Sequence, residues 1–215
     1  SFMPEKIVTN EDLSHMVDTS DEWIMKRIGV RRRHVCTTET VTDLGAEASR
    51  RALEDAGVKP EELDLIIAAT ISADSISPGL GGMVQQRLGA HCPAFDMNVA
   101  CPGFLFAMDV AAGFFARKTV KKVLVVSAER MSGLLDWTDR STCCIFGDGA
   151  GAAVLGEGDA YLASELHTQG GDDIINIPTW WNNSPFYERE LLRNKVNMEG
   201  QATYKFAVTS MVGDI

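Results

Sequence analysis

The stretch that decides the fold is FDMNVACPGFLFAMDV, residues 95–110. It starts inside a short apolar run, PAFDMNV at 93–99, that predicts a strand. After it comes PGFLFAMDVAAGFFARK, residues 102–118, which is apolar nearly all round and predicts a buried helix. The sequence therefore places Cys101 at the joint between two buried elements, directly before a proline.

The residues alone leave two interpretations of Cys101 open. Placed in the first turn of the helix, with Pro102 at the first helical position, the thiol would lie near backbone N–H groups and a positive dipole end that favour a thiolate nucleophile. Burial would act in the opposite direction, and Gly103 would let another backbone or a ligand approach closely. The alternative is a free cysteine that only packs in the core.

The neighbouring segments alternate between helix and strand patterns, which indicates an α/β fold with an at least partly parallel sheet. The stretch at 143–157 is interpreted as two short apolar runs on either side of a glycine turn. Helices are expected at 42–58, capped by Thr42 or Asp43 and ended by Gly57, at 78–89 and at 198–215, and strands at 63–70, 121–129 and 161–171.

Composition limits the classes of function. The chain has 215 residues, enough for one large domain or two small ones, and its formal net charge of −10 argues against nucleic-acid binding. No apolar run reaches about 18 residues and no signal peptide is visible, so we expect no membrane span. The cysteines indicate no disulfide framework, for which a reducing cytoplasm is the simplest location. One basic cluster, at residues 26–33, is either a solvated surface or a binding site for a phosphate or an acidic partner. It contains Lys26, Arg27, Arg31, Arg32 and Arg33.

Metal and dinucleotide sites are not favoured. The 5 cysteines form no C-x-x-C pair and the 4 histidines show no ligand spacing, so neither a metal site nor a disulfide framework is expected. Gly147, Gly149 and Ala152 fit a dinucleotide-binding pattern. However, the residues that follow are too few for the helix that this pattern requires.

Four motifs, in one order along the chain, carry a resemblance to a known family. They are TSDEWIMKRIGVRRRH (19–34), AFDMNVACPGFLFAM (94–108), TDRSTCCIFGDGAGAAVL (138–155) and MEGQATYKFAV (198–208). Together they resemble β-ketoacyl-acyl carrier protein synthase III, a family of thiolase-fold condensing enzymes. The resemblance implies a layered αβαβα fold with mixed five-stranded sheets and a buried helix carrying the nucleophile. It also implies a first thiolase-like half at 1–158 and the start of a second at 159–215.

The resemblance also implies a reaction. Cys101 would take an acyl group from acyl coenzyme A and pass it to malonyl-acyl carrier protein by decarboxylative Claisen condensation, which initiates fatty acid synthesis. The Cys101 backbone N–H would form half of an oxyanion hole. Trp23 and Arg140 would stack on the two faces of adenine, and Arg27 would contact phosphate. The full set implied for coenzyme A and substrate binding is Thr19, Trp23, Arg27, Arg140, Met198, Gly200, Gln201 and Tyr204, and the acyl pocket would include Ser77 and Phe146.

Three of the binding residues also have a purely structural interpretation. Trp23 could cap the edge of a core, and Arg140 could pair with Asp136 or Asp139. Tyr204 lies on an amphipathic pattern that is typical of core packing.

The sequence departs from the family pattern in several places. The family's histidine and asparagine lie beyond the last residue, and the family's first strand lies before the first. We therefore expect a chain that is incomplete at both ends and that cannot condense as a 215-residue piece. Gln201 and Tyr204 stand where asparagine and phenylalanine are usual. Ser77 stands about where many relatives have phenylalanine, which predicts room for a longer or branched acyl chain.

The resemblance implies no tightly bound cofactor, with acyl coenzyme A as a substrate. The implied partners are malonyl-acyl carrier protein and a second copy in a homodimer, with no nucleic acid and no membrane. Two alternatives stay open. One is a related enzyme of secondary metabolism that passes the acyl group to another nucleophile. The other is a non-catalytic protein that binds acyl groups or carriers.

Overall fold

The computed structural model describes residues 1–178, 185–186, 188 and 195–213, and the chain divides into two compact units. Unit 1 consists of Ser1–Ile7, His34–Met131 and Gly147–His167. Unit 2 consists of Val8–Arg33, Ser132–Phe146 and Thr168–Ile215. The expected division of the family fold at residue 158 stays a prediction.

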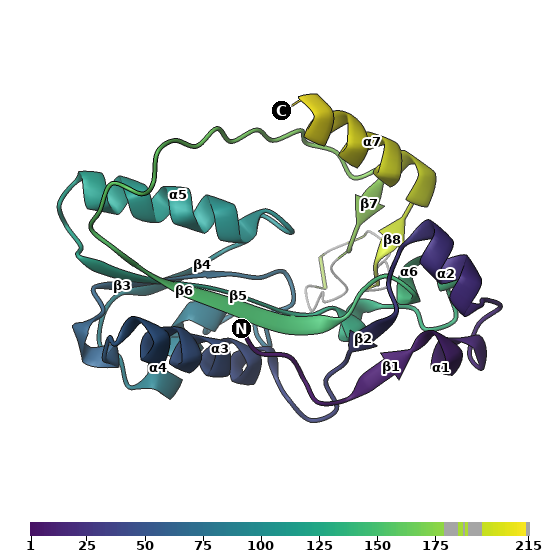
Figure 1. The fold of residues 1–215 in the computed structure, drawn as a ribbon, viewed down its shortest axis with the longest axis horizontal. Coiled ribbons are helices and arrows are strands. Elements are labelled where there is room, and N and C mark those ends of the chain that lie inside the picture. Colours follow the sequence, from purple (N-terminus) through teal and green to yellow (C-terminus); the bar gives the residue numbers. More distant parts are fainter. Residues whose placement is uncertain (179–184, 187, 189–194, 214–215) are drawn as a thin grey trace. The chain divides into compact units, whose positions relative to one another are not determined.

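The chain folds into strands, α-helices and two 3₁₀ helices, of which Figure 1 labels the strands and the α-helices. In chain order they are β1 (Ile7–Thr9), α1 (Asn10–Ser14), α2 (Asp21–Arg27), β2 (Arg32–His34), α3 (Val41–Ala56), the 3₁₀ helix η1 (Pro60–Glu62), β3 (Leu65–Ala69), α4 (Leu80–Leu88), β4 (Ala94–Met97), α5 (Gly103–Ala116), β5 (Lys122–Arg130), the 3₁₀ helix η2 (Met131–Leu134), α6 (Arg140–Cys143), β6 (Asp148–Gly156), β7 (Ile175–Asn176), β8 (Asn197–Met198) and α7 (Gly200–Gly213).

The main sheet of unit 1 is mixed, in the order β4-β3-β5-β6. Strand β3 runs parallel to both β4 and β5, while β5 and β6 are antiparallel. Every residue of β3 is buried, as expected for a central strand whose apolar run is covered on both faces. Phe2 forms an isolated antiparallel bridge with Ala150 of β6, so among the described residues the sheet has four strands and not the expected five.

Helices cover both faces of this sheet, with α3 and α4 on one side and α5 on the other (Figure 1). Neighbouring residues of β3 point to opposite faces. Ile66 packs in the core under α3 and α4, and Ile67 packs in the core under α5. The unit is therefore an α/β/α arrangement, in agreement with the expected thiolase-like α/β fold.

Helix α3 begins earlier than predicted. Its cap is Thr40, not Thr42 or Asp43, because the Thr40 side chain accepts from the Asp43 backbone N–H and the Asp43 carboxylate accepts from the Thr40 backbone N–H. This reciprocal capping satisfies two donors that a helix start leaves unpaired. Gly57 ends the helix in the left-handed conformation, as predicted.

Two strand predictions in the middle of the chain are wrong. Strand β6 runs without a break from Asp148 to Gly156, so its glycines lie in a ladder with β5 and not in a turn. The expected strand at 161–171 is also absent, because this segment has no assigned secondary structure. The glycine pattern at 147–152 therefore lies on a strand with no helix after it, which excludes a dinucleotide fingerprint.

Helix α5 is buried on one face only, whereas its sequence predicts burial all round. Gly103, Ala107 and Ala111 are buried and form a stripe of small residues. Ala107 and Ala111 belong to the core shared with β3 and β5. By contrast, Leu105 is 62% exposed. Small side chains on the buried stripe let the helix backbone approach the sheet closely.

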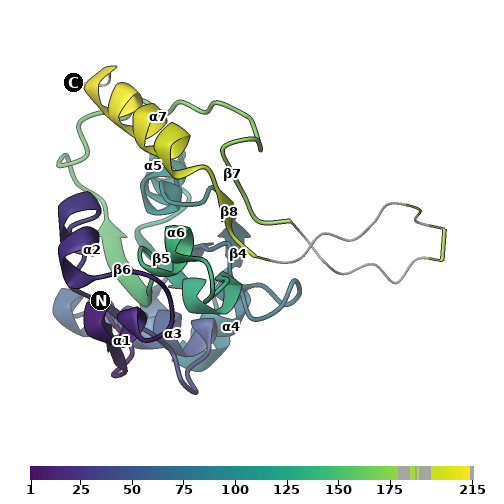
Figure 2. The same cartoon turned by 90° about the vertical axis from the view of Figure 1, so that its right-hand side faces the viewer.

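Unit 2 has its own small core, which consists of Leu13, Ile24, Cys143 and Cys144. The predicted C-terminal helix is found as α7, which follows β8 closely in Figure 2. None of its residues is buried, and Tyr204 is 71% exposed. The interpretation of Tyr204 as a core residue is therefore wrong. In the described part of the chain, no helix combines the length and apolar character needed to cross a membrane.

Candidate functional site

Cys101 is exposed in the turn between β4 and α5. The helix begins one residue later than predicted, at Gly103, and Pro102 is its N-cap. Cys101 therefore precedes the first turn instead of lying in it. Its exposure contradicts the interpretation of this cysteine as a buried core thiol.

The backbone before Cys101 adopts an uncommon conformation. Ala100 has a φ of 51°, in the left-handed region that residues with a Cβ rarely adopt. Its carbonyl oxygen accepts a hydrogen bond of 3.0 Å from the Gly103 N–H, which closes a tight turn around Cys101. Such conformations persist where the surrounding structure holds them, and they concentrate at functional sites.

Gly103 brings the start of α5 directly against the sheet. A Cβ at this position would lie 2.8 Å from the Cβ of Ala69, the last residue of β3. Real Cβ atoms essentially never approach so closely, so only glycine fits without a shift. The predicted close approach at Gly103 is confirmed. It fixes where the Cys101 turn lies relative to the end of β3.

A second set of predicted residues gathers in unit 2, around Trp23 on α2. Ser20 caps this helix by accepting a 3.1 Å hydrogen bond from the Trp23 N–H. The Cζ atom of Arg27 lies 5.3 Å from the centroid of the Trp23 ring, and that of Arg140 lies 5.2 Å away. The indole is thus a platform for planar cations. Arg140 is far from Trp23 and Arg27 in the sequence, and the fold brings it to them here.

Arg140, the first residue of α6, does not form the ion pairs considered from the sequence. Its Nη1 donates to the Asp18 carbonyl oxygen at 2.6 Å and approaches an Asp18 carboxylate oxygen at 3.5 Å. Asp136 instead accepts from Lys195 Nζ at 2.7 Å, and this hydrogen bond holds the pKa of the Asp136 carboxyl well below its usual range. Asp139 caps α6 by accepting from the Ser141 N–H.

A buried network ties α2 to α6. The Asn10 amide donates to Asp21, the first residue of α2, at 2.7 Å. Its oxygen accepts from Arg33, which also donates to the Cys144 carbonyl oxygen just after α6, both at 2.9 Å. Burial lowers the pKa of the Arg33 guanidinium. The network holds the helix that carries Trp23 beside the helix that carries Arg140.

The burial of Arg33 separates it from the rest of the basic cluster, for which the sequence left a solvated surface and a binding site as alternatives. Arg33 is 3% exposed, whereas Lys26, Arg27, Arg31 and Arg32 are exposed. The exposed members remain available to a phosphate or to an acidic partner.

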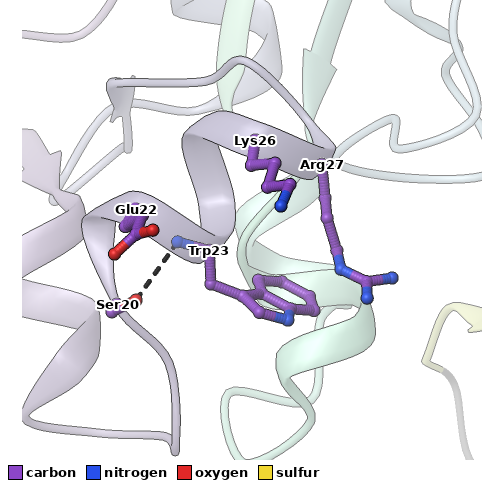
Figure 3. Close-up of a pocket in the computed structure, with 5 residues that line it drawn as sticks. All are labelled: Ser20, Glu22, Trp23, Lys26 and Arg27. Carbon is purple, nitrogen blue, oxygen red and sulfur yellow. Dashed lines mark hydrogen bonds between the residues drawn. The ribbon is translucent and has the colours of Figure 1, made fainter.

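A surface pocket of about 480 Å³ lies on α2. Figure 3 shows that its lining residues, Ser20, Glu22, Trp23, Lys26 and Arg27, all come from α2 and the residue that caps it. The pocket pairs an aromatic face with two cations, a combination suited to a ligand with a planar base and phosphate groups. Sequence reasoning missed Ser20 and Glu22 and assigned Lys26 only to the basic cluster. The i, i+3, i+4 spacing of 23, 26 and 27 would have indicated one helix face.

The other predicted site residues have known positions but no demonstrated role. Thr19 lies just before the cap of α2, and its hydroxyl oxygen is buried without a hydrogen-bond partner among the described residues. Met198 ends β8, and Gly200, Gln201 and Tyr204 are exposed at the start of α7. Ser77 is exposed in unit 1, and Phe146 is half-buried in unit 2. The roles implied for all of them stay predictions.

The segment that leads into β8 is anchored within unit 2. The Val196 N–H donates to the Leu134 carbonyl oxygen at 2.8 Å, beside the Lys195–Asp136 ion pair. The start of α7 thus follows a fixed strand. Among the residues that the structure describes, no group of three or more histidine, cysteine or acidic side chains could hold a metal ion.

Comparison with known proteins identifies the family. Residues 95–170 match the family model for 3-oxoacyl-[acyl-carrier-protein (ACP)] synthase III. The chain is 46% identical over 220 aligned positions to the β-ketoacyl-[acyl-carrier-protein] synthase III of Clostridium acetobutylicum, covering all of this chain and 68% of that protein. The corresponding protein of Caldanaerobacter subterraneus is 44% identical, with 98% of this chain and 66% of that protein covered.

Solved structures agree with the sequence comparison. The crystal structure of 3-oxoacyl-[acyl-carrier-protein] synthase III from Aquifex aeolicus matches with a TM-score of 0.88 and 38% identity, covering 98% of this chain and 66% of that one. A priming β-ketosynthase from a polyketide biosynthetic pathway matches with a TM-score of 0.85 and 33% identity, covering 99% and 65%.

These matches place the chain in a class of acyltransferases, the condensing enzymes with a thiolase-like fold. The chain belongs to the β-ketoacyl-[acyl-carrier-protein] synthase III family. It spans about two thirds of the length of the curated relatives that it matches.

Proposed function

We propose that this chain carries the acyl-accepting part of a β-ketoacyl-acyl carrier protein synthase III that initiates fatty acid synthesis. The Cys101 thiolate attacks the carbonyl carbon of an acyl coenzyme A, and the coenzyme A thiolate leaves. A malonyl-acyl carrier protein then loses carbon dioxide, and the resulting carbanion attacks the Cys101 thioester. This second attack releases a β-ketoacyl-acyl carrier protein and regenerates the Cys101 thiolate.

The observation that carries the proposal is the exposed thiol of Cys101 in its turn. The left-handed Ala100 and the helix start at Gly103 hold this thiol at the surface, where a thioester can reach it. Other cysteines are poorer candidates. Burial raises the pKa of Cys36 and of Cys143 to about 12, so both stay protonated at neutral pH.

The α2 pocket supports coenzyme A as the donor. Trp23 offers an aromatic face for adenine, and Lys26 and Arg27 offer charge for its phosphates. Arg140 contacts Trp23 directly, so stacking of adenine between the two requires them to separate. The residues Thr19, Met198, Gly200, Gln201 and Tyr204 are proposed to line the path of the pantetheine arm.

The acyl group is proposed to lie near Phe146 and near Ser77 of a second copy in a homodimer. A serine at position 77 leaves room for a longer or branched chain. The proposed location is the cytoplasm. The curated relatives bear the synthase name, and they do not favour a secondary-metabolism enzyme or a non-catalytic binding protein.

The acidic acyl carrier protein is proposed to contact the exposed part of the basic cluster. Because Arg33 is buried, a charge-reversal test must be confined to Arg31 and Arg32. The double variant Arg31→Glu/Arg32→Glu should weaken the use of malonyl-acyl carrier protein and spare acylation by coenzyme A thioesters. Equal loss of both activities would reject this contact.

The main experiment is intact-protein mass spectrometry after incubation with a panel of acyl coenzyme A thioesters, followed by peptide mapping. We expect an added acyl mass on the Cys101 peptide and none in the Cys101→Ala variant. The best-loaded chain length sizes the acyl pocket. A protein that binds coenzyme A but forms no adduct with any thioester would contradict the proposed function.

A further inference from the structure

A carboxylate at the end of β5 is bound by hydrogen-bond donors but has no role in the proposed reaction. Glu129 Oε1 accepts from the Ile71 N–H at 2.8 Å. Its other oxygen accepts from the Ser72 hydroxyl and, at 3.3 Å, from the Thr70 hydroxyl. The donors all belong to the three residues that directly follow β3. One side chain therefore holds the backbone of 70–72.

Ser72 extends this attachment. Its hydroxyl oxygen also accepts from the Arg130 N–H at 2.8 Å, and its own N–H donates to the Thr70 hydroxyl at 3.1 Å. Residues 70–72 are thus fixed against the end of β5 by side-chain and backbone bonds together. Hydrogen bonds to a charged carboxylate are stronger than those between neutral groups.

The fixed segment adjoins the Cys101 turn. Strands β3, β4 and β5 are parallel, so their carboxyl ends meet at one edge of the sheet. The Thr70 N–H donates to the Met97 carbonyl oxygen at the end of β4, at 3.2 Å. Ala69, directly before Thr70, is the residue against which Gly103 packs. Glu129 is thus linked to the Cys101 turn indirectly. It holds residues 70–72, and within and beside this segment Thr70 bonds to Met97 and Ala69 packs against Gly103.

The segment beyond residue 72 is held at two further points. The Asp74 carboxylate accepts from the Val41 and Thr42 N–H groups at 2.9 and 2.8 Å. The Asp96 carboxylate accepts from the Leu80 N–H at 2.6 Å, at the start of α4. Ser77 lies between these two points. Glu129 supplies the first of three carboxylate attachments that shape the segment carrying Ser77.

We propose that Glu129 is a positioning residue for the acylation of Cys101. By fixing residues 70–72, it sets the place of Ala69 under Gly103, and with it the orientation of the Cys101 turn. This inference rests on the proposed function of Cys101. The hydrogen bonds that Glu129 accepts come from residues 70–72, beside the Cys101 turn, so it should act on the rate of acylation and not on thioester binding.

The test compares two changes at the network with two controls. Glu129→Gln keeps the shape of the side chain but replaces one acceptor oxygen with a donor. Ser72→Ala removes the bridging hydroxyl, and Ser72→Thr restores one. Glu62→Gln makes the same chemical change at an exposed glutamate that precedes β3, at the opposite edge of the sheet, where Glu62 pairs with Lys122.

Two readouts are needed. The first is the initial rate of Cys101 acylation, by intact mass, against acyl coenzyme A concentration. We expect Glu129→Gln and Ser72→Ala to lower the maximal rate about tenfold and to leave the half-saturating concentration within about twofold. Ser72→Thr should recover most of the rate, and Glu62→Gln should leave it unchanged. The second readout is amide hydrogen exchange, which should become faster at residues 70–72 and 98–103.

The outcomes separate this inference from the proposed function. If the unaltered protein is never acylated, the proposed function fails, and the exchange data still test the attachment by Glu129. An unchanged maximal rate in both network variants would overturn the inference, as would a rise in half-saturating concentration alone or an equal loss in Glu62→Gln. If Glu129→Gln does not fold, the Ser72 pair decides the question by itself.

Discussion

The guanidinium of Arg140 lies 5.2 Å from the centroid of the Trp23 indole, although the two residues belong to separate helices, α6 and α2. The buried Arg33 connects these helices through Asn10 and the Cys144 carbonyl oxygen. The Trp23–Arg140 pair at the surface is thus supported by a buried polar network that holds its two helices together. The arrangement suggests different consequences for substitutions on the platform and below it.

A substitution on the platform should affect ligand binding and spare stability. In Arg140→Lys, a compact ammonium replaces a planar guanidinium, so the proposed stacking partner of adenine is lost while the charge stays. We expect the half-saturating acyl coenzyme A concentration for Cys101 acylation to rise about tenfold with little change in the maximal rate. Intact-mass kinetics measure both values.

A matched control for this prediction lies on α5. Arg117 stacks over Phe114 with its Cζ atom 5.6 Å from the ring centroid, away from the α2 pocket residues in sequence and in unit. Arg117→Lys should leave the half-saturating concentration unchanged. An equal rise in both variants would mean that Arg140 acts through general stability and not through a coenzyme A contact.

A methyl group at the start of α5 should disturb the Cys101 turn. In Gly103→Ala the new Cβ would lie 2.8 Å from the Ala69 Cβ, so the helix start or the end of β3 must shift. Overpacking of this kind costs about 1–3 kcal/mol in free energy of unfolding. We also expect slower acylation of Cys101, because its turn would move with the helix. Urea denaturation and intact-mass kinetics check the two effects.

Gly113 on the same helix is the matched control, because its replacement by alanine should change the free energy of unfolding in the opposite direction. A Cβ at Gly113 meets no atom within 4 Å, and its backbone is ordinary helix. Gly113→Ala should therefore stabilise the protein by about 0.5–1 kcal/mol and leave acylation unchanged. If both alanine variants behaved alike, contact with Ala69 would not be the reason that glycine stands at 103.

Some of this architecture could be predicted from the sequence because the signal is local. The apolar runs of β3 and β5 and the helical periodicity of α3 depend on neighbouring residues, and a glycine in the left-handed conformation at 57 ends α3 as expected. The Cys101 turn was predicted for the same reason, since strand, cysteine, proline, glycine and helix follow one another directly.

Three of the wrong expectations, those for β6, Arg33 and Arg140, have a common physical origin in long-range pairing. Glycines normally mark a turn, but β6 stays extended through Gly149 and Gly151 because each of its residues pairs with β5. Arg33 belongs to a charged run that indicates a solvated face, yet acceptors from distant segments surround it. The Arg140 contact with Asp18 likewise follows no periodicity. Partners far apart in the sequence leave no local pattern.

A substitution below the platform should affect stability first. Arg33→Met removes a guanidinium that donates to Asn10, to the Val8 carbonyl oxygen and to the Cys144 carbonyl oxygen, and so leaves buried acceptors unpaired. We expect a loss of about 3 kcal/mol in free energy of unfolding. Arg32→Met, at an exposed neighbouring position, should change it by less than about 0.5 kcal/mol. Chemical denaturation of both variants measures the contrast, and equal small effects would show that the network does not bear on stability.

The ionisation of Glu129 should make stability depend on pH in a recognisable direction. Burial raises the pKa of the Glu129 carboxyl above its ordinary value of 4.5, although hydrogen bonds from Ser72 and Ile71 partly oppose the shift. The contribution of this group is therefore fully present below pH 4.5 and is lost as the pH rises through the folded-state pKa. Glu129→Gln cannot ionise, so the stability of the unaltered protein relative to this variant should fall as pH rises and then level off.

Glu62 supplies a control of opposite sign. A hydrogen bond from Lys122 lowers the pKa of the Glu62 carboxyl, so its contribution is present above pH 4.5 and is lost as the pH falls through the folded-state pKa. The stability of the unaltered protein relative to Glu62→Gln should therefore rise with pH over the acid range. Urea midpoints for the three proteins between about pH 3 and pH 8 test both slopes. The prediction fails if the stability of the unaltered protein relative to Glu129→Gln does not change with pH while its stability relative to Glu62→Gln rises as expected. That result would show that Glu129 ionises as an ordinary exposed glutamate and that burial does not raise its pKa.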